Sequence, residues 1–253
     1  MSAPPRPSAG VVLRSIVYSV WLYGLIIVLG LVCLPVLAAP RPVVMAAIRM
    51  WSWLEIWGLR WIVGLKVEVR GLEHRPEGAC LVAAKHQGML DTIAPFGYLA
   101  DPCFVLKQEL IRLPVFGWYG KVSGMIPIDR AAGSTAVRAL NAAAEDRMRD
   151  PRQIIIYPEG TRKAPGAPPD YKSGVASLYR ELGVTCAPMA TNSGLFWPAH
   201  GNLWRPGVAV FEFLEPIPPG LKRAEFMRVL EARIEAASNR LMAESGHPPS
   251  PDL

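Results

Sequence analysis

Cysteine, histidine and charged residues are all scarce in this 253-residue chain. It has four Cys and four His, and 19% of its residues are charged, compared with roughly 25% in a typical soluble domain. The cysteines lie far apart without a CxxC spacing, which argues against a disulfide framework and a zinc site. We therefore expect small buried thiols, a reducing compartment and no bound metal. With 51% hydrophobic residues, the chain is also unlike a disordered one.

The positive charge is concentrated near the N-terminus. The net charge is +6, from 27 Lys and Arg against 21 Asp and Glu. Residues 1–65 contain five Arg and one acidic residue and so carry +4, whereas the remainder, with 22 basic and 20 acidic residues, carries only +2. A nucleic-acid-binding protein gathers Lys and Arg on its folded domain. Here the excess lies beside the most apolar segment, which predicts a phospholipid bilayer as partner and no nucleic acid.

No charged residue occurs between Ser15 and Pro40. A helix over residues 16–39 would have 24 residues. At the α-helical rise this is roughly 36 Å, enough to cross a hydrocarbon core of about 30 Å. The arginines before the run and the small residues after it also fit a signal peptide, whose apolar core is only about 7–15 residues long. The greater length favours a retained membrane helix.

Residues 43–65 have the periodicity of an amphipathic helix and contain four of the eight Trp. One side is apolar and is formed by Met50, Trp51, Trp53, Leu54, Trp57, Trp61 and Leu65. The other side is polar and is formed by Arg49, Ser52, Glu55 and Arg60. Because indole rings prefer the headgroup level, we predict a helix in the membrane interface, with a core helix of the globular domain as the alternative. Residues 1–65 are thus predicted to be N-terminal membrane-associated helices.

From residue 66 onward, strand-like patterns alternate with helical ones. Strands are expected within 66–71, 79–84, 104–110, 153–158, 184–190 and 208–215. Helices are expected over 134–149, with Ser134 as N-cap, and over 175–182 and 222–245. This alternation predicts an α/β fold in which helices flank a sheet. We assign residues 66–246 to one α/β domain and residues 247–253 to a flexible tail.

Polar clusters follow the predicted strands where ligands of an open α/β sheet bind, beyond the carboxyl ends. They are KHQGMLD at 85–91, GMIPIDR at 124–130 and YPEGTR at 157–162. In the first cluster, a helix that starts after the strand would let Asp91 reach a ring nitrogen of His86. That pairing makes His86 a general base for a substrate hydroxyl, typically worth about 10²–10⁴-fold, and backbone amides near Gly88 would stabilise the oxyanion. Taken alone, the spacing also fits a structural histidine.

The other two clusters each place an Arg beyond an apolar strand. The guanidinium groups of Arg130 and Arg162 suit a phosphate group, and Lys107 would add a third positive charge. Gly160 would permit a close approach of the backbone, and Glu159 would hold an Arg or bind substrate hydroxyls. For either Arg alone, an ordinary surface ion pair is the alternative. Their convergence at neighbouring strand ends favours a phosphate site.

The segments His86 to Asp91, Gly124 to Arg130 and Glu159 to Arg162, followed by Pro188, resemble four sequence blocks in order and spacing. They are the blocks of the glycerolipid acyltransferase family, and the likeness is greatest to bacterial 1-acyl-sn-glycerol-3-phosphate acyltransferases of the PlsC type. The resemblance covers about residues 66–215, and the two-helix N-terminus is also similar. It implies a mixed sheet flanked by helices with a two-helix membrane anchor. It also implies transfer of a fatty acyl group from acyl-carrier protein or coenzyme A, as co-substrate without a cofactor, to the sn-2 hydroxyl of lysophosphatidic acid.

By the same resemblance, His86 is the catalytic base and Asp91 orients it. The residues implied to bind the phosphorylated acceptor are Lys107, Arg130, Glu159, Gly160, Thr161 and Arg162. Because thioester donors are made in the cytoplasm, the implied location is the inner membrane with the catalytic domain facing the cytoplasm. Lys85 stands where the family usually has Asn, and Gly88 where it has Ser. Alternative functions are transfer to another lyso-lipid, hydrolysis by the same dyad, and non-catalytic lipid binding.

Overall fold

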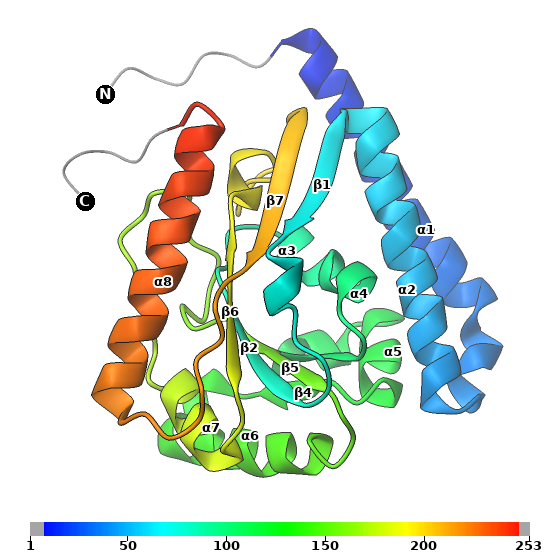
Figure 1. The fold of residues 1–253 in the computed structure, drawn as a ribbon. Coiled ribbons are helices and arrows are strands. Elements are labelled where there is room, and N and C mark those ends of the chain that lie inside the picture. Colours follow the sequence, from blue (N-terminus) through cyan, green and yellow to red (C-terminus); the bar gives the residue numbers. More distant parts are fainter. Residues whose placement is uncertain (1–7, 248–253) are drawn as a thin grey trace.

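The computed structural model describes residues 8–247, which form a seven-stranded sheet with helices on both faces (Figure 1). The strand order is β1-β7-β6-β2-β5-β3-β4. Neighbouring strands are parallel, except that β6 and β7 are antiparallel. The predicted fold class, a mixed α/β sheet flanked by helices, is confirmed.

The strands are β1 Leu65–Arg70, β2 Cys80–Ala84, β3 Pro102–Lys107, β4 Ile126–Ile128, β5 Gln153–Ile156, β6 Cys186–Thr191 and β7 Gly207–Phe213. Six of them match the strands expected from alternating or continuous apolar runs. The exception is β4, which has three residues and lies inside the segment 124–130. A strand this short shows no recognisable periodicity.

The α-helices are α1 Ala9–Val32, α2 Arg41–Gly58, α3 Leu90–Ile93, α4 Pro95–Tyr98, α5 Phe116–Val122, α6 Gly133–Arg147, α7 Gly174–Leu182 and α8 Arg223–Glu244. Short turns of 3₁₀-helix are η1 Leu34–Ala38, η3 Leu72–His74, η4 Gln108–Arg112, η5 Arg130–Ala132 and η6 Ser193–Leu195, and a π-helical turn is η2 Leu59–Val63. The expected helices of the α/β domain correspond to α6, α7 and α8. The expectation that Ser134 caps α6 is wrong, because η5 leads directly into the helix and Ala132 is the N-cap.

The first helix has the predicted length but lies seven residues earlier than predicted, with 24 residues from Ala9 to Val32. Ser8 caps its start through a hydrogen bond from the Val11 amide, and η1, with Pro35 in its first turn, redirects the chain after Val32. By length and composition, α1 could cross a membrane. In the fold it is paired with α2 along one side of the domain (Figure 1).

The second helix turns its polar side toward the domain. Ser52 and Glu55 are fully buried, and the Ser52 hydroxyl donates to the carbonyl of Ile93 over 2.7 Å. On the opposite side, the indole rings of Trp53 and Trp57 are 63% and 42% exposed. A core helix in water would have the reverse arrangement. The outward indoles therefore favour the interfacial position predicted for this helix.

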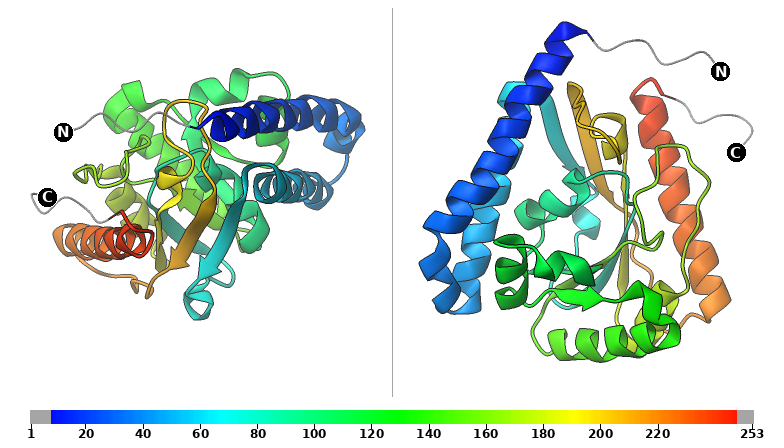
Figure 2. Two further views of the ribbon diagram at one scale, coloured as in Figure 1. Left: turned by 90° about the horizontal axis from the view of Figure 1, so that it is seen from above. Right: turned by 180° about the vertical axis from the view of Figure 1, so that it is seen from behind.

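Helices lie on both faces of the sheet (Figure 2), and a large hydrophobic core lies between them and each face. The first core lies on the side of α1 to α4 and includes Leu22 and Leu90. The second lies on the side of α6, α7 and α8 and includes Leu140 and Phe226. Because the central strands are covered on both faces, their sequences are continuous apolar runs rather than alternating ones.

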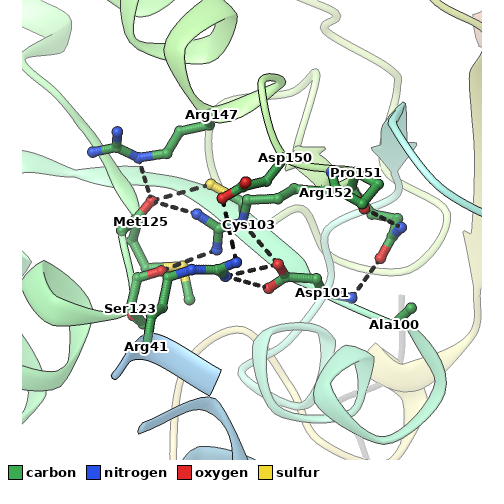
Figure 3. A network of polar contacts seen from close by, with 12 residues as sticks. Arg41, Ala100, Asp101, Cys103, Ser123, Met125, Arg147, Asp150, Pro151 and Arg152 are labelled. Carbon is green, nitrogen blue, oxygen red and sulfur yellow. Dashed lines mark hydrogen bonds and ion pairs between the residues drawn. The ribbon is translucent and has the colours of Figure 1, made fainter. Parts of the chain in front are cut away.

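A network of arginines and aspartates joins α2 to the amino ends of the strands (Figure 3). Arg41, the first residue of α2, lies 2.7 Å from a carboxylate oxygen of Asp101, which precedes β3. The buried Arg152, which precedes β5, lies 3.3 Å from the same oxygen and donates to the carbonyls of Ser123 and Gly124. These contacts fix the two N-terminal helices on the sheet at the edge opposite the predicted site.

Candidate active site

The predicted site residues meet at the carboxyl edge of the sheet. Because β6, β2, β5, β3 and β4 are parallel, their carboxyl ends lie along one edge. His86 follows β2 and Glu159 follows β5. Lys107 ends β3, and Arg130 follows β4. The fourth block, Pro188, lies elsewhere: it is buried inside β6 opposite Ala83.

His86 and Asp91 form a hydrogen-bonded pair. Nδ1 of His86 lies 3.0 Å from Oδ2 of Asp91, which stands in the first turn of α3. The Asp91 side chain is fully buried, and that of His86 is 12% exposed. Since Nδ1 is engaged by the carboxylate, Nε2 is the ring nitrogen that can accept a proton. This is the geometry that the spacing of the two residues predicts.

Every side of the Asp91 carboxylate is engaged by a donor. Oδ2 accepts the amide protons of Gln87 and Gly88 over 2.6 and 2.9 Å, in addition to facing His86. Oδ1 accepts a hydrogen bond from the hydroxyl of Ser193. These contacts satisfy both oxygens of the buried carboxylate. The two amides therefore hold Asp91, whereas we had expected amides near Gly88 to face a reacting oxyanion.

Tyr157 fixes the plane of the imidazole. Its ring stacks on that of His86 with centroids 4.0 Å apart and an interplanar angle of 19°. Its hydroxyl donates to the backbone carbonyl of Asp91 over 2.6 Å. Burial and the nearby Asp91 carboxylate raise the pKa of the Tyr157 phenol well above its usual value, so it remains a neutral donor. No sequence pattern predicts a role for this tyrosine, because its contacts depend on the pairing of β2 with β5.

Glu159 lies beneath the site rather than in it. The side chain is buried, and Oε1 lies 2.9 Å from Nζ of Lys85, while Oε2 accepts the backbone N–H of His86 over 3.4 Å. Lys85 also lies 2.6 Å from a carboxylate oxygen of Glu235 in α8. Burial raises the pKa of Glu159 above its ordinary value although Lys85 lowers it. This placement differs from the prediction that Glu159 holds an Arg or binds substrate hydroxyls.

The remaining residues of the same loop face outward. Thr161 and Arg162 are exposed, and Nη1 of Arg162 donates to the carbonyl of Ala199 over 3.4 Å. The backbone amide of the next residue, Lys163, donates to the carbonyl of His86 over 2.8 Å, which places Arg162 near the dyad. Gly160 has a φ of +67°, a conformation that favours glycine over other residues. Arg162 is thus available to an anionic ligand beside His86.

Lys107 and Arg130 lie on the two strands beyond β5. Lys107 is paired in register with Ile128, the last residue of β4. Its ammonium group is exposed and 3.1 Å from Glu109. Arg130 begins η5, and its side chain lies outside the described part of the structure. The backbone therefore brings both positions to the same edge as His86, as expected.

The segment 192–206 between β6 and β7 crosses the site and reaches the anchor. Beside the Ser193 bond to Asp91, the amide of Gly194 donates to Oε1 of Gln87 over 3.0 Å. Farther along, the amide of Trp204 donates to the hydroxyl of Ser15 in α1 over 3.0 Å. The segment therefore connects the loop that follows β2 to the N-terminal helices. The only sequence signal for it is a pair of polar residues, Asn192 and Ser193, directly after a buried strand.

Gly88 is required by close packing under this segment. A Cβ atom at position 88 would lie 2.5 Å from the carbonyl oxygen of Trp197. Contacts this short do not occur without displacement of one partner. Glycine at position 88, where the family usually has Ser, therefore allows the close approach of segment 192–206. In residues 8–247, no group of three His, Cys, Asp or Glu side chains is placed to hold a metal ion.

Comparison with known proteins places this arrangement in a family. Residues 66–192 match the sequence model of a family described as Acyltransferase. A 1-acyl-sn-glycerol-3-phosphate acyltransferase of Pseudomonas aeruginosa is 33% identical over 160 residues, covering 63% of this chain and 62% of that protein. The human 1-acyl-sn-glycerol-3-phosphate acyltransferase beta is 29% identical over 170 residues, covering 66% and 61%. The matched part thus spans about three fifths of each relative.

A solved structure has the same fold. The crystal structure of the 1-acyl-sn-glycerophosphate acyltransferase PlsC from Thermotoga maritima superposes with a TM-score of 0.70 and 20% sequence identity. The match covers 92% of this chain and 97% of that one, so it includes the N-terminal helices as well as the sheet. The family model covers half of the chain and contains the His86–Asp91 pair and the Glu159–Arg162 loop. The chain belongs to the glycerolipid acyltransferase family.

Proposed function

We propose that the protein transfers a fatty acyl group from acyl-carrier protein or coenzyme A to the sn-2 hydroxyl of 1-acyl-glycerol-3-phosphate, giving phosphatidic acid. The observation that carries this proposal is the buried Asp91 held 3.0 Å from Nδ1 of a partly exposed His86, at a sheet edge where the positions of Lys107, Arg130 and Arg162 follow three neighbouring strands. The thioester is a co-substrate, and the reaction needs no cofactor or metal.

The reaction is a direct acyl transfer. Nε2 of His86 takes the proton of the acceptor hydroxyl as its oxygen attacks the thioester carbonyl carbon. The Asp91 carboxylate stabilises the resulting imidazolium through Nδ1. When the carbon–sulfur bond breaks, the imidazolium returns the proton to the leaving thiolate. Tyr157 keeps the ring in one plane throughout, because it stacks on one face of it.

The acceptor is recognised by its phosphate group. The side chains proposed to bind it are those of Lys107, Arg130, Thr161 and Arg162, with the backbone at Gly160. Glu159 acts on the site from below, since it holds Lys85 and the backbone of His86. Arg162→Ala should raise the KM for lysophosphatidic acid. It should leave the KM for an acyl thioester unchanged, because the proposal assigns Arg162 to the acceptor and not to the donor.

The two N-terminal helices are proposed to hold the site at the inner membrane, with the catalytic domain facing the cytoplasm, where thioester donors are made. Ser15 and Tyr18 face the domain, so the opposite side of α1 is free to meet lipid. The exposed indoles of α2 and η2 extend this surface at headgroup level. A lyso-lipid then reaches His86 without leaving the bilayer.

Mass spectrometry of the products tests the proposal. Purified full-length protein in detergent is given lysophosphatidic acid with acyl-coenzyme A or acyl-carrier protein, beside His86→Ala and a matched control, His74→Ala, on η3. We expect phosphatidic acid from the wild type and the control but not from His86→Ala. Free fatty acid that depends on His86, without acylated lipid, would identify a hydrolase. Activity only with another lyso-lipid would show that the proposed acceptor is wrong and that the acyl-transfer reaction is right.

A further inference from the structure

The segment between β3 and β4 carries a group of apolar side chains that project from the domain. It consists of η4 and α5, residues 108–122, and we call it the η4–α5 segment. Its large exposed hydrophobic side chains are Leu110, Leu113, Phe116, Trp118 and Val122, each between 37% and 48% exposed. Isolated exposed hydrophobic residues are common on soluble proteins, but five in thirteen consecutive residues mark an interaction surface.

The exposure follows from how the segment is built. A Cβ atom on Gly117 would lie 2.0 Å from the carbonyl oxygen of Ile111, so the backbones of η4 and α5 are in close contact. Gly117 and Gly120 are buried in this contact, and Ile111 packs against the first core. The two short turns therefore have no room to fold their larger apolar side chains inward.

The segment is continuous with the apolar face of α1. The hydroxyl of Tyr119 donates to the carbonyl of Gly30 over 3.2 Å, and a Cβ atom on Gly30 would lie 2.1 Å from the Val115 side chain. Next to Gly30, the side chains of Leu31 and Val32 are 49% and 69% exposed. Helix α5 thus lies near the carboxyl-terminal end of α1 (Figures 1 and 2).

Positive charge accompanies these apolar residues. Residues 107–122 contain Lys107, Arg112 and Lys121 against one acid, Glu109, a net charge of +2. An aromatic and aliphatic surface bordered by basic side chains suits the interface of a bilayer that contains anionic lipid. A carrier protein would also satisfy the charge. The continuity with α1 favours the bilayer, because the two apolar surfaces adjoin.

We propose that the η4–α5 segment docks on the anionic bilayer surface as a further membrane-binding element beside α1 and α2. It begins at Lys107, the last residue of β3, and extends from the carboxyl edge of the sheet to the contact of Tyr119 with Gly30 of α1. This inference rests on the proposed function only in that the substrate is a membrane lipid. Binding to vesicles is measured without turnover, so the two proposals can fail separately.

Vesicle partitioning tests the proposal. Full-length protein is titrated with vesicles of phosphatidylcholine, with and without phosphatidylglycerol. We expect Phe116→Ser/Trp118→Ser to lower the partition coefficient about tenfold or more, because two apolar side chains that the bilayer would bury are lost. The control Leu72→Ser/Val208→Ser changes two exposed apolar residues of η3 and β7 and should leave partitioning unchanged. Arg112→Gln/Lys121→Gln should weaken binding about fivefold or more per charge, only on vesicles with phosphatidylglycerol.

A second measurement locates the segment directly. In a Cys33→Ser background, Trp118→Cys with a nitroxide label should be protected from a water-soluble relaxation agent and accessible to oxygen once vesicles are added. Unchanged partitioning and a solvent-accessible label would overturn the proposal. Loss of carrier-protein binding, or of a dimer, in Phe116→Ser/Trp118→Ser with normal partitioning would assign the surface to that partner instead. Turnover in detergent micelles should be the same in these variants and the wild type.

Discussion

The hydroxyl of Ser193 donates a hydrogen bond to the buried Asp91 carboxylate from 102 residues farther along the chain. Asp91 in turn orients His86, so the two segments that follow β6 and β2 share one hydrogen-bonded array. Ser193 is fully buried and acts on the reaction only through Asp91. We therefore regard it as a positioning residue that completes the dyad.

Ser193→Ala should lower kcat about tenfold or more and leave both KM values unchanged. The reason is that a hydrogen bond to a charged group contributes about 1.5–3 kcal/mol. The bond from Ser193 positions the Asp91 carboxylate, which in turn orients His86. Steady-state kinetics with both substrates measures the effect. The matched control is Ser238→Ala, because Ser238 is a buried serine of α8 whose hydroxyl lacks a partner in the described residues. A raised KM with normal kcat in Ser193→Ala would show that Ser193 serves substrate binding.

Lys85→Met should destabilise the fold by about 3–5 kcal/mol, because it leaves two carboxylates beneath the site without their cation. Lys85 lies 2.9 Å from Glu159 and 2.6 Å from Glu235. Chemical denaturation of the detergent-solubilised protein measures the loss. Adding Glu159→Gln should recover a large part of it, since one buried charge is then removed. Equal stability of Lys85→Met and the wild type would refute the role assigned to this ion pair.

The exposed pair Lys107–Glu109 provides the comparison for that experiment. Both side chains are more than half exposed, at 56% and 60%. Lys107→Met should therefore change the unfolding free energy by less than about 1 kcal/mol. A comparable loss in both variants would mean that the effect of Lys85→Met comes from the methionine and not from the buried charges.

Gly88→Ser, which restores the usual family residue, should lower stability by about 1–3 kcal/mol and also lower kcat. Its Cβ would lie 2.5 Å from the Trp197 carbonyl, and the displacement would disturb the Gly88 amide that binds Asp91. Thermal unfolding and kinetics measure the two effects. Gly174→Ser is the control, because a Cβ there meets nothing within 4 Å. Full activity of Gly88→Ser would show that the 192–206 segment adjusts freely.

Glu55→Gln should remove a pH dependence of stability. Burial raises the pKa of Glu55 to about 8, and the hydrogen bond from Tyr18 offsets only part of that shift. Between pH 4.5 and about 8 the folded state keeps a proton that the unfolded chain releases. Stability therefore falls as the pH rises through this window, by up to about 1.4 kcal/mol per pH unit.

Denaturation at pH 5, 6.5 and 8 measures the slope. In Glu55→Gln the slope should be smaller than in the wild type, and the variant should be the more stable of the two at pH 8. The exposed Glu73→Gln should keep the wild-type slope. Parallel curves for Glu55→Gln and the wild type would contradict a protonated Glu55 in the folded state.

The sequence predicts most of the fold and the central pair of the site, since both leave local patterns. The apolar runs before His86 and Glu159 are long enough to identify β2 and β5, and the five-residue spacing predicts the bond between His86 and Asp91. The orientation of Glu159 was not predictable. Its partner Lys85 is 74 residues away, and the second acid, Glu235, comes from α8, 150 residues beyond Lys85.

The same limit applies to Ser193 and to the inward polar face of α2. A single serine after a buried strand has no pattern of its own, and its partner is set by the pairing of β2 with β6. For α2, periodicity identifies two faces but not which one meets protein. That depends on the hydrogen bond from Ser52 to the carbonyl of Ile93 and on the hydrogen bond from Tyr18 to Glu55.

The hydrogen bond between Trp204 and Ser15 joins residues 189 positions apart, and this has a consequence for synthesis. The anchor helices leave the ribosome first, followed by the dyad and the Glu159–Arg162 loop. Segment 192–206, which contacts both α1 and the loop after β2, emerges only after β6. A nascent chain thus completes its N-terminal helices early and the hydrogen-bonded array around Asp91 late. Contacts between residues so far apart in sequence slow folding, so we expect the docking of segment 192–206 on α1 to be among the last steps.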